Sequence, residues 1–361
     1  MATDKHLIAL THFLPFGPVC LAKLNGLGSW QAAWQASLRT LAAIGLEEKI
    51  AADFISWRAH IKVDELAANL ARQQITTVAL TEKNYPPLLK EIFQPPPLLY
   101  YQGDLSCLKN QPTLAVVGSR RASHYGQQAV DYLVKDLAGA GLTIVSGLAF
   151  GIDALAHQAA LDAGGRTVGV LGSGLDRPNF YPLTNWALAQ KMIARGGAVI
   201  SEFPPGTHAE KFNFPRRNRL ISGLSLGILV VEAAAKSGSL ITAHYGLEQN
   251  REVLAIPGNI FSGTSAGTNH LLKLGAKIVT KAEDVLIALR LEKTLPRTAP
   301  ALVLNETEAA LAAVLNHEPK HVNELKILLN LDISVITGTL TLMEIKGLVK
   351  NIGSMSYVKN F

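Results

Sequence analysis

The sequence predicts an α/β protein whose main domain is a parallel β-sheet covered by helices on both faces. Apolar runs rich in Val, Ile and Leu recur between residues 113 and 280 and mostly alternate with segments of helical character. These runs are nearly continuous rather than alternating, as in strands that are buried on both faces. Each run is followed by a loop, and several of these loops are rich in glycine.

The composition favours a cytoplasmic protein with a polyanionic partner. The 361 residues suggest two or three domains, and 48% hydrophobic against 17% charged residues provides for sizeable cores. The net charge of +6 favours a polyanion over an acidic surface. Cys20 and Cys107 lie far apart without metal spacing and fit a reducing compartment. The N-terminus makes a poor secretion signal, and no uninterrupted apolar run reaches the ~18 residues of a membrane span.

The chain begins with a predicted helical domain, residues 1–70. Apolar positions recur there at three- and four-residue spacing, for example through Val63, Leu66 and Leu70. The segment from Pro15 to Ser29 loosely resembles a helix–hairpin–helix turn, which would point backbone amides at a phosphate. The alternative is a small helical bundle that binds no ligand. In either case the domain is expected to be of the SAM or helix–hairpin–helix kind.

Residues 71–112 are expected to form an extended connector that joins the core. The sequence TTVAL resembles a short strand, YPPLLKEI a turn into a short helix, and PPPLLYYQG a strand led by prolines. The residue before each proline is pushed out of the helical region, which favours extended backbone.

The sheet domain is predicted over residues 113–290. Its strands are expected within LAVVG, TIVSG, TVGVLG, AVISE, LGILVVE, EVLAIPG and AKIVT. In sheets of this kind ligands bind at the carboxyl ends of the strands, near a topological switch. The glycine-rich turns of this sequence all follow strand ends, so this edge is where a ligand is expected.

A linker at residues 291–302 precedes a separate C-terminal domain at 303–361. The linker, LEKTLPRTAPAL, has proline, threonine and charge without periodicity. Three helices followed by a hairpin match the winged-helix plan, with the third helix near Ile333–Ile345. That helix has lysines only at its end, Lys346 and Lys350, so a protein-interaction or packing role is favoured over duplex binding.

The stretch KFNFPRRNRLIS, from Lys211 to Ser222, combines cations with aromatic rings. The cations are Lys211, Arg216, Arg217 and Arg219, and the rings are Phe212 and Phe214. Cations bind phosphates, and exposed rings stack on bases at roughly 1–3 kcal/mol per base without reading sequence. Pro215 is expected to break the backbone before the arginines. The alternative is that the phenylalanines are core residues and the arginines are the solvated start of a helix.

The loop GSRRASHYG, residues 118–126, is a candidate phosphate site. Gly118 permits a tight turn, Ser119 and Ser123 can donate hydrogen bonds to phosphate oxygens, and Arg120 can bind two of them. The loop lacks the Lys-Ser/Thr ending of a nucleotide-triphosphate loop, and Gly126 does not fall where the dinucleotide pattern requires a glycine. The alternative is a plain strand–helix connection.

No catalytic group, cofactor or metal site is predicted. The histidines are scattered, and Glu202 and Glu232, which end strands on the ligand side, are expected to brace the basic loop by ion pairing.

Taken together, these motifs resemble the DprA (Smf) family of bacterial DNA-processing proteins. The motifs are GSRRASHYG, SGLAFGID, FPRRNRLIS, EAAAKSGSLITA, AIPGN and GTNHLL, in this order. The resemblance implies an extended Rossmann-like core that binds single-stranded DNA, forms a homodimer and helps to load the recombinase RecA during natural transformation. It also implies DNA contacts by Arg120, Lys211 and Phe214, with Arg216, Arg217 and Arg219 in the same basic pocket and Asn218 as a loop brace. The loop 176–182 is longer than is usual in the family.

Two other functions remain open from the sequence. Related folds hydrolyse nucleoside monophosphates with a PGGxGT loop and a glutamate, but here Pro257-Gly258 lacks the second glycine and the threonine. The C-terminal domain could instead regulate transcription, although its poor charge argues against that.

Overall fold

The computed structural model describes residues 3–291, 304–316 and 318–359. The chain divides into two compact units, residues 1–295 and 296–361. Apart from Leu291, the predicted linker 291–302 lies outside the described residues.

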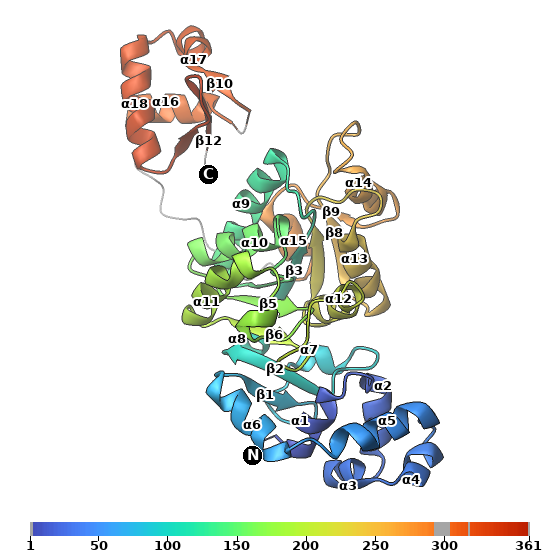
Figure 1. Cartoon of the computed structure of the whole chain (residues 1–361). Helices are drawn as coiled ribbons and strands as arrows, with labels where there is room; N and C mark the ends of the chain where they lie inside the picture. Colours follow the sequence, from blue (N-terminus) through green and yellow to red (C-terminus); the bar gives the residue numbers. More distant parts are fainter. Residues whose placement is uncertain (1–2, 292–303, 317, 360–361) are drawn as a thin grey trace. The chain divides into compact units, whose positions relative to one another are not determined.

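The first unit contains a nine-stranded sheet in the order β1-β2-β6-β5-β4-β3-β7-β8-β9 (Figure 1). Its strands are β1 (Thr76–Ala79), β2 (Leu98–Gly103), β3 (Thr113–Val117), β4 (Thr143–Ser146), β5 (Thr167–Leu171), β6 (Ala198–Ser201), β7 (Gly227–Val230), β8 (Glu252–Ala255) and β9 (Lys277–Ile278). Neighbouring strands from β3 to β9 pair in parallel, for example Val117 with Val230. The predicted α/β class with a mostly parallel sheet is confirmed.

The segment expected to be only an extended connector adds two strands to this sheet. β2 pairs antiparallel with β6, with Tyr100 opposite Ser201, and β1 pairs antiparallel with β2. Leu98, Leu99 and Tyr100 are all buried. The prolines that precede β2 suit its first position, because a proline there removes no ladder hydrogen bond.

Helices cover both faces of the sheet, as the continuous apolar runs predicted. They are α7 (Pro87–Lys90), α8 (Cys107–Asn110), α9 (His124–Gly139), α10 (Ile152–Asp162), α11 (Trp186–Ala194), α12 (Asn213–Gly223), α13 (Gly238–Glu248), α14 (Ala266–Lys273) and α15 (Ala282–Ala288). On one face α9, α10 and α15 pack on Leu114 and Val116. On the other, α7, α12 and α13 pack on Ala115 and Val117.

The N-terminal region is helical, as predicted. Its helices are α1 (Lys5–His12), α2 (Pro18–Asn25), α3 (Trp30–Gln35), α4 (Leu38–Ala43), α5 (Glu48–Arg58) and α6 (Val63–Arg72). Helices α1 to α5 contribute to a core around the fully buried Phe54, whereas Leu70 of α6 packs with Leu7 of α1 and Leu98 of β2. Helix α1 reaches the sheet, where the hydroxyl of Thr11 lies 2.5 Å from that of Tyr100.

The second unit is a winged-helix domain. It contains α16 (Glu306–Val314), β10 (Lys320–His321), α17 (Val322–Leu329), α18 (Ile333–Ile345), β11 (Val349–Asn351) and β12 (Ser356–Lys359). The strands form a small sheet in the order β10-β12-β11, and Leu325, Ile336 and Leu340 lie in the core. The third helix covers the predicted residues.

One helix pair in the described part of the chain has the length and composition of a membrane span. It joins 322–329 to 333–345 and is bent by 113°, and no single helix there meets the same test.

Candidate nucleic-acid interface

The glycine-rich loops meet at the carboxyl edge of the sheet. The chain runs outward from β3 through β4 and β5 to β6, and then returns to place β7 beside β3 on the other side. The loops after β3 and β7 therefore separate, which is where ligands bind in open α/β sheets. A cavity of about 290 Å³ lies at this point. Its lining includes Gly118, Arg120, Asp153, Phe214, Arg217, Asn218, Ser237 and Ser239.

Helix α12 carries most of the predicted site residues, and it begins earlier than expected. Phe212 is its N-cap, so Pro215 lies in the first turn instead of ending the backbone there. The expectation that Pro215 breaks the backbone is wrong. Backbone N–H groups in the first turn of a helix have no partner within the helix, so a proline there removes no hydrogen bond. The arginines at 216, 217 and 219 therefore leave a regular helix in different directions.

Phe214 lines the cavity and is only partly buried. The guanidinium carbon of Arg120, which is itself exposed, lies 5.2 Å from the centroid of the Phe214 ring. The centroid of the Tyr181 ring, which is 43% exposed, lies 5.8 Å from that of Phe214, and the two rings are tilted by 50°. A cation over one ring with a second ring beside it makes a surface on which a flat apolar group with a phosphate can bind.

Arg217 turns inward and is 4% exposed. Its Nη1 donates hydrogen bonds to the carbonyl oxygens of Gly147, at 2.6 Å, and Val170. A Cβ placed on Gly147 would lie 2.6 Å from the Asp153 carboxylate and 2.7 Å from Arg217 Nη1, so only glycine lets these two charged groups approach the loop.

Burial and charge shift the pKa values of this inner group. Burial raises the pKa of Asp153, and Arg217 opposes that shift. Burial lowers the pKa of Arg217 to about 10, with Asp153 acting in the other direction. Burial, and then Arg217, lower the pKa of His157 to about 3, so this histidine is neutral in the fold.

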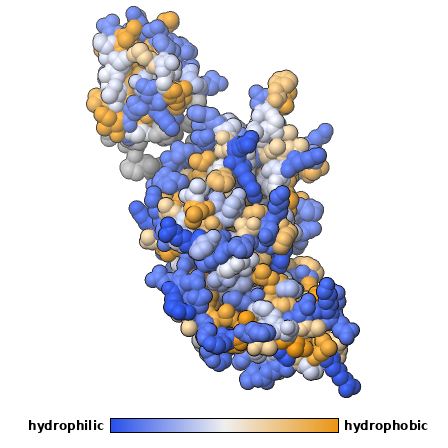
Figure 2. Space-filling view, in the orientation of Figure 1, coloured by the Kyte–Doolittle hydropathy of each residue, from blue (hydrophilic) through white to orange (hydrophobic). Residues whose placement is uncertain are grey.

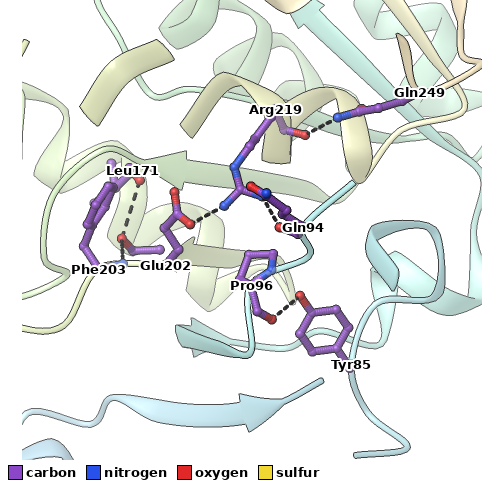
Figure 3. A network of polar contacts seen from close by, with 9 residues as sticks. Tyr85, Gln94, Pro96, Leu171, Glu202, Phe203, Arg219 and Gln249 are labelled. Carbon is purple, nitrogen blue, oxygen red and sulfur yellow. Dashed lines mark hydrogen bonds and ion pairs between the residues drawn. The ribbon is translucent and has the colours of Figure 1, made fainter. Parts of the chain in front are cut away.

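Arg219 also faces the interior, on the side of β6 (Figure 3). It forms an ion pair with Glu202 and donates a hydrogen bond of 2.9 Å to the carbonyl of Gln94. The Glu202 side chain is 5% exposed; burial raises its pKa, and Arg219 and then Arg216 oppose the shift. The predicted bracing role of Glu202 is confirmed, and it connects α12 to β6 and to the segment before β2.

Arg216 takes a third direction. Its guanidinium carbon lies 5.2 Å from the centroid of Phe203, and it lines a second cavity, of about 400 Å³, between the N-terminal helices and the chain after β6. At the start of α12, Lys211 is exposed and Phe212 is 64% exposed.

Asn218 holds α12 to the neighbouring loop. Its side-chain amide donates to the carbonyl of Gly238, at 3.3 Å, and its oxygen accepts from Arg217 Nε, at 3.2 Å. The residue thus connects the inner arginine to the start of α13.

The loop 118–126 is closed by a carboxylate. Glu232, 1% exposed, accepts a hydrogen bond of 3.0 Å from the amide of Ser123 and another from its hydroxyl. The Ser123 hydroxyl also caps Gly126, and the Ser119 hydroxyl donates to the carbonyl of Arg121 at 2.9 Å. A negative side chain thus occupies the start of α9, where a phosphate was expected. Glu232 braces this loop by hydrogen bonds rather than by the expected ion pair.

The predicted cations and Phe214 thus lie in separate places. Arg120, Phe214 and Arg217 meet at the first cavity, together with Gly118 and Asn218. Arg216 lines the second cavity, and Arg219 is engaged with Glu202. These side chains do not form one continuous trough.

The sequence did not single out Tyr181 as a partner of Phe214 or Asp153 as a neighbour of Arg217. Tyr181 belongs to the long loop 176–182, and no sequence pattern connects it to Phe214, which is 33 positions away. Among the described residues, no three His, Cys, Asp or Glu side chains are grouped as metal ligands would be.

Comparison with known proteins gives a consistent result over both units. Residues 76–290 match the family DNA recombination-mediator protein A, and residues 295–352 match the DprA winged helix domain. The DNA processing protein DprA of Bacillus subtilis is 43% identical over 224 residues, which cover 62% of this chain and 74% of that protein.

Two solved structures are similar to this one. DNA processing protein A of Streptococcus pneumoniae has a TM-score of 0.67 and 38% identity, over 80% of this chain and 98% of that one. DNA processing protein A of Helicobacter pylori, solved for its single-stranded DNA binding mode, has a TM-score of 0.54 and 30% identity, over 60% of this chain and 96% of that one.

Proposed function

Since the chain belongs to the DprA (Smf) family of DNA recombination mediators, we propose that it binds single-stranded DNA at the carboxyl edge of its sheet. The observation that carries this proposal is the distance of 5.2 Å between the Arg120 guanidinium carbon and the centroid of the Phe214 ring, both of which line one cavity. A ring and a cation side by side match the alternation of base and phosphate in a strand. The single-stranded DNA binding of the Helicobacter pylori relative supports it.

The residues have different parts in this proposal. Arg120, Lys211 and Arg216, which are exposed or partly exposed, bind phosphates, and Phe214 stacks on a base. Arg217, Asn218 and Arg219 act from inside, since their hydrogen bonds fix α12 in place. The loop residues Gly118, Ser119, Ser123 and Gly126 set the position of Arg120 rather than coordinate phosphate themselves.

The proposal is tested by the affinity for a labelled oligothymidine, measured by fluorescence anisotropy. Phe214→Ala should weaken binding by about 1–3 kcal/mol, the value of one base–aromatic stack. The control is Tyr132→Ala, a partly exposed tyrosine of α9 beside the acidic Asp136, Glu283 and Asp284. Equal affinities of the two variants would place the DNA elsewhere.

Protection of incoming DNA and loading of RecA during natural transformation are the further part of this proposal, with the protein acting in the cytoplasm. A mediator of this kind shortens the delay before RecA hydrolyses ATP on DNA that is already covered by single-strand-binding protein. The delay should shorten with this chain and return with Phe214→Ala. A delay unchanged by the wild-type chain would refute the loading role while leaving DNA binding intact.

We also propose a homodimer formed through the Rossmann-like core. β9 is one of the two edge strands of the sheet, and its Ile278 is 57% exposed. Leu274, just after α14, is 72% exposed, and Phe261, in the loop before α14, is 91% exposed. Figure 2 shows an apolar tip on the first unit where the loop before α14 projects in Figure 1. Apolar residues on an unpaired edge favour a partner. Leu274→Glu should convert a two-chain species to one chain in analytical ultracentrifugation.

The proposal involves no enzymatic activity and no cofactor, in keeping with a family of recombination mediators. A nucleoside monophosphate hydrolase would need a carboxylate available to the sugar. Glu232 instead accepts hydrogen bonds from Ser123 and Thr264, and Glu202 pairs with Arg219. Release of adenine from adenosine monophosphate would revive the enzymatic alternative.

A further inference from the structure

Helix α18 of the winged-helix domain exposes an apolar stripe along one face. The stripe consists of Val335, Gly338, Leu342 and Ile345, and we call it the α18 seam. Its spacing of three, four and three residues keeps all four on one side of the helix. Val335 is 45%, Leu342 54% and Ile345 79% exposed. Apolar atoms accordingly reach the surface of this unit (Figure 2).

Gly338 has no function within the domain that requires a glycine. A Cβ built on it meets nothing within 4 Å, and its φ is not in the left-handed region. Glycine inside a helix costs roughly 0.5–1 kcal/mol relative to alanine. A glycine in the middle of an exposed apolar stripe is typical of a place where another chain approaches closely.

The polar residues beside the seam can lose water at little cost. The hydroxyl of Thr337 donates to the carbonyl of Ile333 at 2.8 Å, and that of Thr341 donates to the carbonyl of Thr337 at 2.9 Å. Both hydroxyls are therefore satisfied by their own helix and need no water or partner. A DNA-reading helix would instead offer free donors and cations, which the seam does not.

The seam is symmetric about the level of residue 340. Val335 and Ile345 lie five positions on either side of it, and Gly338 and Leu342 lie two positions on either side. When two copies of α18 run antiparallel, each Leu342 faces a Gly338 and each Val335 faces an Ile345. Large residues then meet small ones, as close packing of two helices requires.

The charges at the two ends of the helix are complementary in the same arrangement. Asp332, the N-cap, makes no side-chain capping bond, while the exposed Lys350 follows the other end; Lys346, the C-cap, is already paired with Glu308. An antiparallel pair brings Asp332 of one copy toward Lys350 of the other, and it also opposes the two helix dipoles favourably. A parallel pair would place like charges together.

We propose that α18 is an interface for a second copy of this chain, with the two helices packed antiparallel through the α18 seam. Because the seam is short, it gives only a weak dimer by itself. The two helices pair when other contacts already hold two copies close together, as when both are bound to one DNA strand. The helix that reads DNA in other winged-helix domains joins protein to protein here.

Cysteine pairing tests the proposal directly in the full chain. Cys20 is first replaced by serine, and the buried Cys107 is kept. Val335→Cys and Ile345→Cys are made as separate proteins and mixed under mild oxidation. Positions 335 and 345 are about 15 Å apart along a helix, so an antiparallel pair brings only unlike positions within disulfide range. We expect the cross-linked dimer in the mixture and not in either protein alone.

Other patterns overturn the proposal. A cross-link of Val335→Cys with itself indicates a parallel pair, and no cross-link in the mixture indicates no pairing. If seam variants lower affinity for duplex DNA while the mixture gives no cross-link, DNA is the occupant. Because the readout is the pattern of pairs, a dimer formed through the core alone does not reproduce it.

A second substitution separates pairing from folding. Gly338→Leu places a side chain where Leu342 of the other copy would lie, and its Cβ has open space within the domain. We expect an unchanged or higher melting temperature and at least a tenfold loss of cross-linking rate. Ile327→Glu, an 82% exposed residue of α17 outside the seam, is the matched control and should keep the cross-link. Undiminished cross-linking of Gly338→Leu would overturn the packing of Leu342 on Gly338.

Discussion

On helix α12, the arginines that turn toward the sheet differ from the cations around its outer start in what they contact. Arg217 and Arg219 meet carbonyl oxygens and a carboxylate inside the protein. Arg120 and Arg216 reach the surface, where each lies over an aromatic ring, and Lys211 is exposed. Arg217 also lies 5.9 Å from the centroid of Phe214, so the two groups differ in burial and in their hydrogen bonds. The cations between Lys211 and Arg219 thus serve two purposes, because a helix turns successive side chains by about 100°.

The difference separates structural stability from DNA affinity. An inner arginine is bound to fixed partners, so its removal leaves buried polar groups unsatisfied. An outer cation has no such partners to lose, so its removal should change binding and leave the fold intact. The comparison therefore yields opposite expectations for neighbouring residues.

The largest effect is expected for Arg217→Ala on the free energy of unfolding. The substitution leaves the carbonyls of Gly147 and Val170 without a donor and Asp153 without a nearby cation. Breaking a buried charge pair costs about 3–5 kcal/mol. Denaturation in urea measures this loss.

The adjacent Arg216→Ala is the control for that measurement. Arg216 is partly exposed and contacts a ring, so its loss should change the unfolding free energy by no more than about 1 kcal/mol. Equal losses for the two variants would remove the distinction between inner and outer arginines.

The inner region should also make the fold sensitive to acid through His157. Its pKa falls from 6.5 to about 3 on folding, because burial and then Arg217 disfavour the charged ring. The unfolded chain therefore binds a proton that the fold does not. The contribution of neutral His157 to the free energy of unfolding is therefore complete above pH 6.5. It is lost as the pH falls toward 3, at about 1.4 kcal/mol per pH unit.

Unfolding experiments between pH 6.5 and 4.5 measure this slope. His157→Gln, which has no titrating ring, should reduce the loss of unfolding free energy over that interval by roughly 2 kcal/mol. His244→Gln is the control, because the His244 side chain is 71% exposed. Parallel curves for His157→Gln and the wild type would contradict the buried, neutral histidine.

Much of the fold followed from sequence because periodicity reports burial. The runs around Val116 and Val230 predicted strands covered on both faces, and the structure has helices on both. The connector was underestimated, because β2 pairs antiparallel with a strand about 100 residues later, and no local pattern indicates that partner. The three helices and the hairpin of the winged-helix domain were predictable because they are consecutive, whereas the short strand β10, which pairs with β12, was not predicted.

The site was less predictable, because the partners of its side chains are also distant in sequence. Composition identified the cations and rings of 211–219, but the partners that turn Arg217 inward lie just after β4 and on β5, about 50 to 70 positions away. Glu232 likewise reaches the start of α9 across more than 100 positions. A motif supplies the side chains, while distant strands decide which of them remain at the surface.

The smallest effect, and the sharpest test of the comparison, is expected in the salt dependence of DNA binding. Each phosphate neutralised on a single strand contributes a slope of about 0.7 in log affinity against log salt. Lys211→Ala should therefore reduce the slope by about 0.7. The double variant Glu202→Gln with Arg219→Met removes an inner ion pair without changing net charge, and should leave the slope unchanged. Titrations of oligothymidine at four salt concentrations distinguish the two. A lower slope in the double variant and none in Lys211→Ala would mean that the inner arginine, rather than the outer lysine, meets the phosphates.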